Sequence, residues 1–139
     1  MKPEERELAS LRNQHAELMK KMSAIHKLMY KKYELPEKKK NIGRCFKFRN
    51  SYGNPKQGWW LYTMITDVQD GDYTLLEFEQ DAEGRASIRV NRGNPVDRRE
   101  YLPITAQEFI TKFKAVRAEL LALALTISGQ QKEKHHAHL

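Results

Sequence analysis

The sequence predicts an α+β protein in which a long N-terminal helix of coiled-coil type and a C-terminal helix flank a small antiparallel β-barrel. Three observations support this class: apolar residues recur at helical spacing over 1–35, alternate at every second position over 41–103, and return to helical spacing from 105. The predicted segments are therefore a helix at 1–35, a barrel at 36–104, a helix at 105–128 and a flexible tail at 129–139.

The N-terminal segment has the spacing of a coiled-coil helix. Eight of its residues follow one another at alternating intervals of three and four positions: Leu8, Leu11, His15, Leu18, Met22, Ile25, Met29 and Lys32. This alternation is the a/d seam of a heptad repeat, which needs a partner helix to cover it. Pro36 is expected to end the helix, because the residue before a proline disfavours helical geometry.

Five short strands are expected between the helices. The first places Ile42, Phe46 and Phe48 on one face, and the second, 59–68, is apolar on both faces and should be central. Asp70-Gly71 is a tight-turn signal leading into 73–79, and a second turn at 81–84 leads into 85–91. A last short strand occupies 100–104. Five such strands favour an SH3-like barrel, and an OB-like barrel is a close alternative that periodicity cannot separate from it.

The barrel core is predicted from the same alternation. Its expected members are Phe46, Phe48, Trp60, Tyr62, Leu76, Phe78, Ile88 and Val90. Two residues of this set, Phe48 and Trp60, are large enough that truncation to alanine should unfold so small a domain.

The C-terminal helix begins with a capping box, Thr105 to Glu108, and Gly129 is expected to end it. At about 1.5 Å per residue it is longer than a small barrel is wide, so part of it should overhang. Two helices with uncovered seams favour a homodimer, and pairing within one chain is the alternative. The residues predicted to form the oligomer contacts are Leu11, Leu18, Met22, Ile25, Leu120 and Leu123.

The charge of the chain is concentrated in one region. The formal net charge is +7, and 20–49 alone has eleven basic residues against Glu34 and Glu37, a local net of +9. Such an excess attracts nucleic acid or an acidic protein surface. The alternative is that these lysines only solubilise a helix and its connection.

A basic and aromatic surface is predicted on the barrel face opposite the core. If Phe46 and Phe48 point inward, their neighbours Lys47 and Arg49 point outward, and Arg89 does so in the fourth strand. Interleaved cations and rings are typical of single-stranded nucleic-acid binders. The predicted binding residues are Lys38, Lys39, Lys40, Arg44, Lys47, Arg49, Tyr52, Trp59 and Arg89.

No set of residues predicts catalysis, a cofactor or a metal. The glycines are isolated, so no phosphate loop is indicated. His15 and His26 lack a third ligand at helical spacing, and Cys45 has no histidine neighbour in sequence. The acidic residues of 67–81 alternate with apolar ones, as solvent-facing positions do. The chain is therefore predicted not to be an enzyme.

The sequence predicts a cytoplasmic protein with no membrane passage. A single cysteine excludes an intrachain disulfide, and charged residues occupy the N-terminal positions where a signal peptide needs an apolar run. The longest apolar stretch, 120–127, is far shorter than the roughly 20 residues that span a bilayer.

Three segments of the chain share a pattern with a known group of proteins. They are Ile42-Gly43-Arg44-Cys45-Phe46-Lys47-Phe48-Arg49-Asn50, then Trp59-Trp60-Leu61-Tyr62, and finally Tyr101-Leu102-Pro103-Ile104-Thr105 with Glu108-Phe109. This pattern, over 41 to about 113, resembles small phage- and prophage-encoded proteins with a helical N-terminus and a small barrel. The resemblance implies a setting in the host cytosol and no common activity, so it assigns no functional residue.

Two functions follow as hypotheses. The first is a phage-type accessory protein that docks, through helices and its basic patch, on an acidic protein surface or a nucleoprotein, for example to inhibit it. The second is a nucleic-acid-binding module that uses the basic segment and the barrel face. Salt dependence separates them, because phosphate contacts weaken steeply with salt while apolar docking barely responds.

Overall fold

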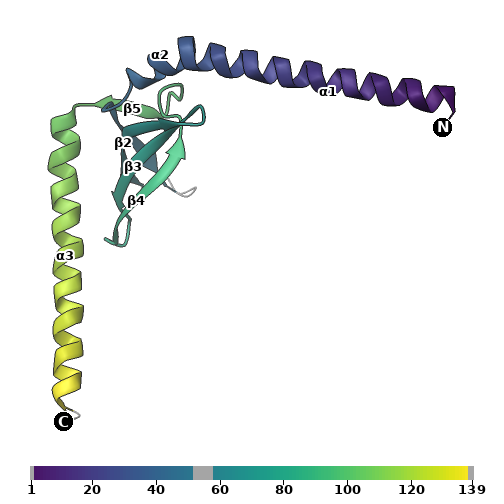
Figure 1. Cartoon of the computed structure of the whole chain (residues 1–139). Coiled ribbons are helices and arrows are strands. Elements are labelled where there is room, and N and C mark those ends of the chain that lie inside the picture. The colour runs from purple at the N-terminus through teal and green to yellow at the C-terminus, as the bar shows by residue number, and fades with distance from the viewer. Residues whose placement is uncertain (1, 52–57, 138–139) are drawn as a thin grey trace. The chain divides into compact units, whose positions relative to one another are not determined.

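The computed structural model describes residues 2–51 and 58–137, and the chain forms two units, Met1–Lys40 and Asn41–Leu139. The first unit is helical, and the second holds the sheet and the C-terminal helix (Figure 1). The α+β class predicted from the sequence is thereby confirmed.

The first unit is one continuous helix with a wide turn in it. It consists of α1 (Pro3–Met29), the π-helical turn η1 (Tyr30–Glu34) and α2 (Leu35–Lys39). The predicted end at Pro36 is wrong, because the helix runs on to Lys39. In the π-helical turn the Leu35 amide donates to the carbonyl of Tyr30, five residues back. This widening is where the chain accommodates a proline, which lacks an amide and whose ring clashes with the preceding turn of a regular helix.

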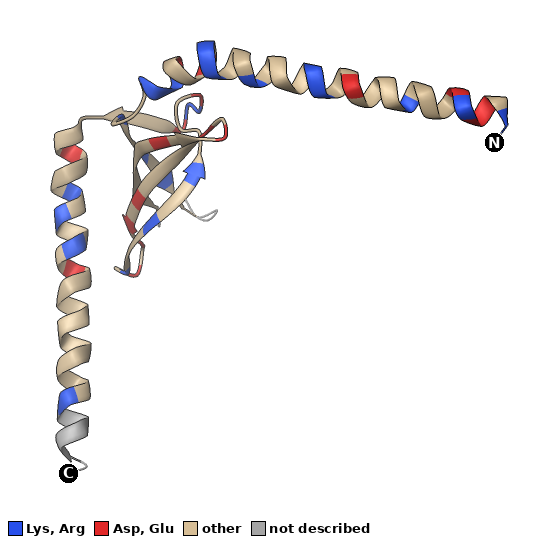
Figure 2. Ribbon diagram, viewed as in Figure 1, with Lys and Arg blue, Asp and Glu red and all other residues tan. Residues whose placement is uncertain are grey.

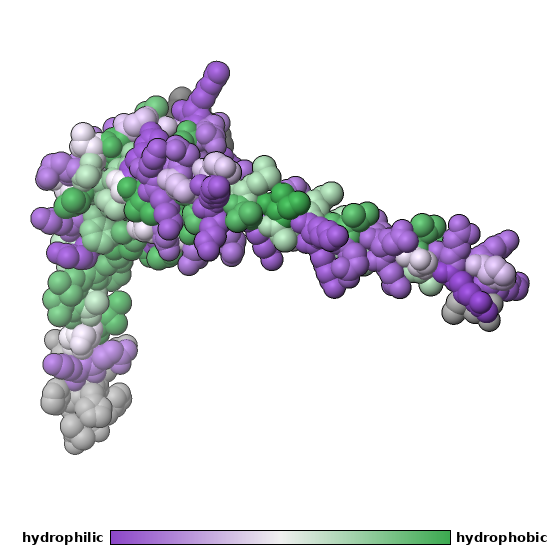
Figure 3. Space-filling model, turned by 45° about the horizontal axis from the view of Figure 1, so that its top comes forward, coloured by the Kyte–Doolittle hydropathy of each residue, from purple (hydrophilic) through white to green (hydrophobic). Residues whose placement is uncertain are grey.

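No residue of α1 is buried. We call Leu8, Leu11, Leu18, Met22, Ile25 and Met29 the apolar seam. Between 48% and 64% of the surface of the large apolar residues of α1 is exposed, and Figure 3 shows hydrophobic side chains along this helix. Among the described residues 2–40 of the first unit, nothing covers the heptad pattern.

Five antiparallel strands form one sheet in the second unit. They are β1 (Cys45–Asn50), β2 (Trp59–Gln69), β3 (Asp72–Gln80), β4 (Ala86–Gly93) and β5 (Tyr101–Ile104), in the order β4-β3-β2-β1-β5. The two edge strands, β4 and β5, do not pair with each other in the described part of the chain, so the sheet is open. The closed SH3-like or OB-like barrel is not confirmed.

The local features that define the strands agree with the sequence. Strand β2 is central, as its two apolar faces predict. Asp70 and Gly71 both have positive φ, 50° and 80°, in the turn between β2 and β3. Positive φ at both central residues is what a hairpin turn needs to match the strand twist, and it favours glycine.

Helix α3 (Ala106–Ala137) covers one face of the sheet (Figure 1). Phe109 and Val116 from α3 are buried together with Cys45 and Phe78 from the sheet. The rings of Phe109 and Phe113 meet the ring of Phe78 edge-on, with centroids 4.9 and 5.6 Å apart. This cluster is the larger of the two cores.

The opposite face has its own core, and this corrects the predicted one. Phe46, Ile65, Tyr73 and Leu75 are buried there, with Val96 and Tyr101 packed against them. The register pairs Phe46 with Thr63 and Phe48 with Leu61, so both phenylalanines lie on the face opposite Trp60, Tyr62 and Phe78. The predicted single core was therefore wrong: its members divide between two faces, and one of them, Val90, is 73% exposed.

A bulge in β2 changes the face of the sheet on which the later side chains of the strand lie. The register of β2 against β3 shifts between Ile65 and Asp67. One extra residue reverses which later side chains point to which face, so Val68 packs with Ile65 and Tyr73 and not on the Trp60 face, where simple alternation from Trp60 would place it.

The start of α3 is as predicted and its end is not. The Glu108 amide donates to the Thr105 hydroxyl at 3.1 Å, which caps the helix. Helix α3 continues through Gly129 to Ala137, so the predicted end at Gly129 and the flexible tail beyond it are wrong over 130–137. Leu123, Leu125 and Ile127 remain 49–64% exposed, which agrees with an overhanging second half.

Candidate functional site

A group of cations and rings lies on the α3-covered face of the sheet, beside the helix. We call Lys47, Arg49, Trp60 and Tyr62 the cation–aromatic surface. Strands β1 and β2 place it, because Arg49 is the register partner of Trp60 and Lys47 is the partner of Tyr62. Side chains of partnered residues point to the same face, so all four meet there.

The two cations lie against the indole of Trp60. Lys47 Nζ is 4.7 Å from the centroid of the Trp60 ring, and Arg49 Cζ is 5.4 Å from it. Both distances are within the roughly 6 Å at which a cation is attracted to an aromatic face. Lys47 Nζ is also 3.7 Å from the Glu108 carboxylate, which ties β1 to the first turn of α3.

The guanidinium of Arg49 lies close to the backbone of Gly58. A Cβ on Gly58 would lie 2.5 Å from Arg49 Nε, closer than any real contact of this kind. The absence of a side chain at Gly58 therefore leaves room for the Arg49 guanidinium beside the start of β2.

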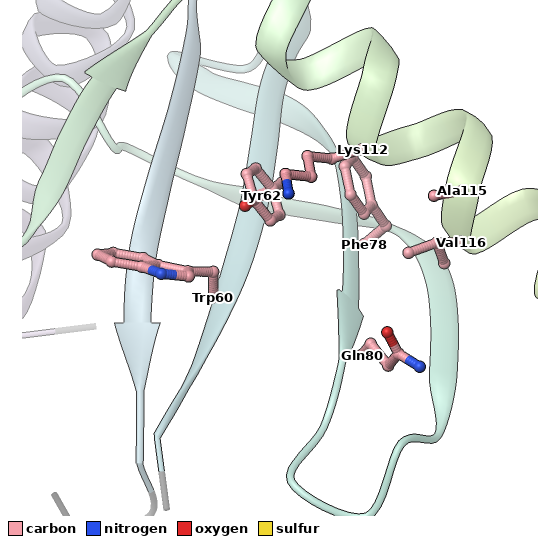
Figure 4. Close-up of a pocket in the computed structure, with 7 residues that line it drawn as sticks. All are labelled: Trp60, Tyr62, Phe78, Gln80, Lys112, Ala115 and Val116. Atoms are coloured by element: carbon pink, nitrogen blue, oxygen red, sulfur yellow. The ribbon is translucent and has the colours of Figure 1, made fainter.

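A cavity of about 260 Å³ lies between this surface and α3. The sheet contributes Trp60, Tyr62, Phe78 and Gln80, and the helix contributes Lys112, Ala115 and Val116. Figure 4 shows Lys112 reaching from α3 toward the Tyr62 ring. The cavity thus has aromatic and aliphatic walls and a cation at its edge.

The rings of the cavity are held in place. Tyr62 stacks on Phe78 with ring centroids 5.0 Å apart and planes 8° from parallel. Burial, and then the nearby Glu108 carboxylate, raise the pKa of the Tyr62 hydroxyl above its usual value. The phenol is therefore neutral at pH 7 and can donate a hydrogen bond. The Gln80 amide nitrogen donates to Glu119 at 2.9 Å and to the Gly84 carbonyl at 3.2 Å.

Trp59 and Arg89, two predicted binding residues, lie on the other face. Trp59 Nε1 donates to Glu79 at 2.7 Å, and Arg89 Nη1 donates to Glu79 at 3.0 Å. Arg89 Nε is also 3.6 Å from Glu77, whose side chain is only 4% exposed. Their predicted common surface with Lys47 and Arg49 is therefore wrong, since the pleat sends the two pairs to opposite faces.

This second group forms an ionic cluster inside the sheet. Asn91 Nδ2 donates to Glu77 at 2.9 Å, so the buried carboxylate has an amide and a guanidinium as partners. The pKa of the Tyr101 hydroxyl is raised, mainly by burial and next by the negative charge of Glu77. The charge of Glu77 is thus compensated within the fold, and removing one partner would leave it buried and less well paired.

The remaining predicted binding residues are dispersed. Lys38, Lys39 and Lys40 belong to the end of the helical unit, where Lys40 pairs with Glu37 at 2.7 Å. Figure 2 shows further basic residues along the second half of that helix. Arg44 lies over Phe46 at 5.1 Å and donates to Asn41. Tyr52 lies outside the described residues.

The predicted oligomer residues are accessible to different degrees. Leu11, Leu18, Met22 and Ile25 on α1 are 50–62% exposed, and Leu123 on α3 is 55% exposed. Leu120 is partly buried against the α3 core, so it contributes to the fold of a single chain. Five of the six residues are therefore available to a partner.

The sequence reasoning missed Trp60, Tyr62, Gln80 and Lys112. The signal that points to the two rings is cross-strand register: because 59–68 is apolar on both faces, only the pairing with β1 decides which ring joins Lys47. Lys112 precedes Phe113 and follows Phe109 by three residues, so it lies at the edge of the buried stripe of α3.

Comparisons with known proteins gave no match: no family model fits the chain, and neither a curated protein nor a solved structure is similar to it. Within residues 2–51 and 58–132, no three side chains of the His, Cys, Asp and Glu types gather as they would around a metal ion. Over the same part of the chain, no helix is both long and apolar enough to cross a membrane.

Proposed function

We propose that this chain is a non-enzymatic binding protein of the phage accessory type, which docks on a partner protein or nucleoprotein through its helices and basic segment. Docking of this kind inhibits a partner by occupying the surface that the partner needs. One observation supports it most: the apolar seam runs the length of α1, and no residue of α1 is buried. A seam of this size exposed to water is typical of interaction sites.

The surface of α3 supports the same proposal. From Leu120 to Gln131 the helix has no charged residue, and Leu121, Leu123 and Leu125 are 55–64% exposed. Figure 2 shows this uncharged stretch as several turns without blue or red. We expect the chain to self-associate through the two helices, since pairing would remove both stripes from water.

Charge substitutions in the seam test this proposal. The double variant Leu18→Glu and Ile25→Glu should release monomers, because it places buried carboxylates in the interface. Asn13→Glu with Ser23→Glu is the matched control, since it adds two carboxylates to α1 outside the seam. Light scattering should show an oligomer for the wild type and the control and a monomer for the seam variant. A monomeric wild type at tens of micromolar would contradict the dimer.

The basic segment should select the partner. We expect the triple variant Lys38→Glu, Lys39→Glu and Lys40→Glu to slow association with an acidic partner, because like charges then repel. All three residues lie in the helical unit, so the melting temperature of the sheet should hardly change. Partner capture that the triple variant leaves unchanged at both low and moderate salt would contradict a role for these lysines.

A second candidate function is binding of nucleic acid, and the cation–aromatic surface is the observation that favours it. Lys47 and Arg49 lie over an indole, and cations beside stacked rings bind phosphates and bases together. Affinity for an oligonucleotide should then fall steeply with salt. Affinity that does not change with salt would contradict this function and leave the first.

A further inference from the structure

We propose that the cavity beside Trp60 accepts one base of a single-stranded nucleic acid, while Arg49 and Lys112 hold the adjacent phosphates. The inference rests on the second proposed function and adds the site, the strandedness and the residues.

The walls of the cavity suit a flat ring. Trp60 and Tyr62 provide two aromatic surfaces, and Val116 and Ala115 close the side of the helix. These rings are already ordered, because Tyr62 stacks on Phe78 and Trp60 lies against two cations. Ordered rings lose little conformational entropy when a base stacks on them, and base stacking is tolerant of sequence.

The size of the cavity suits a single ring system. Its volume of about 260 Å³ is slightly below the range of pockets that enclose whole drug-sized molecules, roughly 300–1,000 Å³. A base in a duplex is stacked on both sides and cannot enter such a cavity. An unpaired base can, so the structure favours a single strand.

The two cations come from different elements. Arg49, on β1, lies against the Trp60 ring, and Lys112, on α3, lines the cavity. Neither cation takes part in any of the ion pairs found among the described residues, whereas Lys47 pairs with Glu108. Positive groups next to aromatic rings match the alternation of phosphate and base along a strand.

The polar wall of the cavity fits the edge of a base. The Gln80 amide nitrogen is committed to Glu119 and Gly84, which holds the side chain in one position at the cavity. The Tyr62 hydroxyl is neutral at pH 7 because burial and Glu108 raise its pKa. A carbonyl and a hydroxyl at the rim can bond to base edges without selecting strongly among them.

Trp59 and Trp60 are adjacent in sequence and lie on opposite faces of the sheet, so the cavity face can be tested separately from the other. The probe is an oligothymidylate of about twelve nucleotides, within the range of single-strand site sizes. In Trp59→Phe the sole remaining tryptophan is Trp60, and we expect its fluorescence to be quenched on binding. In Trp60→Leu the remaining Trp59 should show no quenching, and the affinity should fall roughly ten-fold or more. Circular dichroism melting checks that both variants are folded.

Charge variants on α3 separate a phosphate contact from general attraction. Lys112→Gln should lower the slope of log affinity against log salt by about 0.7, the value for one phosphate of a single strand. Lys114→Gln removes the same charge from the same helix at a position that does not line the cavity, and it should leave the slope unchanged.

The outcomes separate a failure of the cavity site from a failure of nucleic-acid binding altogether. Oligonucleotide binding that is unaffected in Trp60→Leu overturns the cavity site and leaves nucleic-acid binding at another surface. An absence of binding even at low salt overturns both. Heparin, a polyanion without bases, should bind without quenching Trp60; quenching equal to that of the oligonucleotide overturns the base site in favour of an acidic partner.

Discussion

Helices α1 and α3 carry the same alternation of three- and four-residue spacing, yet only α3 has buried residues. Phe109 and Val116 are 2% and 7% exposed against the sheet, whereas no residue of α1 is buried. The stripe of α3 packs on the sheet of its own unit, whereas among the described residues 2–40 nothing covers the stripe of α1. A periodic apolar stripe thus indicates that a helix needs a partner, and it does not indicate whether that partner is in the same chain.

The largest contrast between the two regions should appear in the free energy of unfolding. Phe78 is fully buried against the rings of Phe109 and Phe113, so Phe78→Ala should cost about 3–5 kcal/mol. Leu18→Ala on exposed α1 should change the stability of a single chain by under about 0.5 kcal/mol. Urea denaturation below the concentration of self-association measures both. Equal losses would show that the seam of α1 is covered within the chain.

Ion pairs in the sheet and on α1 should also differ in their contribution to stability, though by less. Arg89→Leu leaves the Glu77 carboxylate in the sheet with Asn91 as its remaining partner, and should cost about 2 kcal/mol. This is less than for a fully buried pair, because Arg89 is 40% exposed. The pair of Lys20 and Glu17 on α1 is 77% and 68% exposed, so Lys20→Gln should have almost no effect. If Lys20→Gln lowered the free energy of unfolding as much as Arg89→Leu does, the ion pairs of α1 and of the sheet would not differ in their contribution to stability.

The N-terminal caps of α1 and α3 should also differ in their contribution to stability. Thr105 caps α3 by accepting a hydrogen bond from the Glu108 amide, and Thr105→Ala should cost about 1 kcal/mol in thermal unfolding. The N-cap of α1 is Lys2, which lacks the short polar side chain of a good cap, so Lys2→Ala should leave unfolding unchanged. Thr105→Ser should recover the stability of the wild type, since it keeps the hydroxyl.

The smallest effect should be a pH dependence of the sheet unit. Burial raises the pKa of Cys45, and burial followed by the Glu77 charge raises the pKa of Tyr101. The folded state therefore retains protons that the unfolded chain has released, and stability should fall as pH rises from about 8 to about 10.5. The urea midpoint measures this fall. It should be shallower in Tyr101→Phe, and a steeper fall would contradict the sign.

Much of the architecture could be predicted from the sequence. Helical spacing before 35 and after 105, alternation between them, and the turn residues Asp70 and Gly71 determined the class, the number of strands and the central position of β2. Thr105 and Glu108 determined where α3 begins. These features are local, because each depends on residues within a few positions of one another.

Only the tertiary structure decided which residues share a face. Trp60 rather than Trp59 joins Lys47 and Arg49, because the register of β1 against β2 pairs them and an alternating pattern is equally satisfied on either face. The bulge after Ile65 then moves Val68 across, and the approach of α3 brings Lys112 to the same cavity. Register, bulge and helix docking depend on contacts far apart in the chain, so no local pattern in the sequence could determine them.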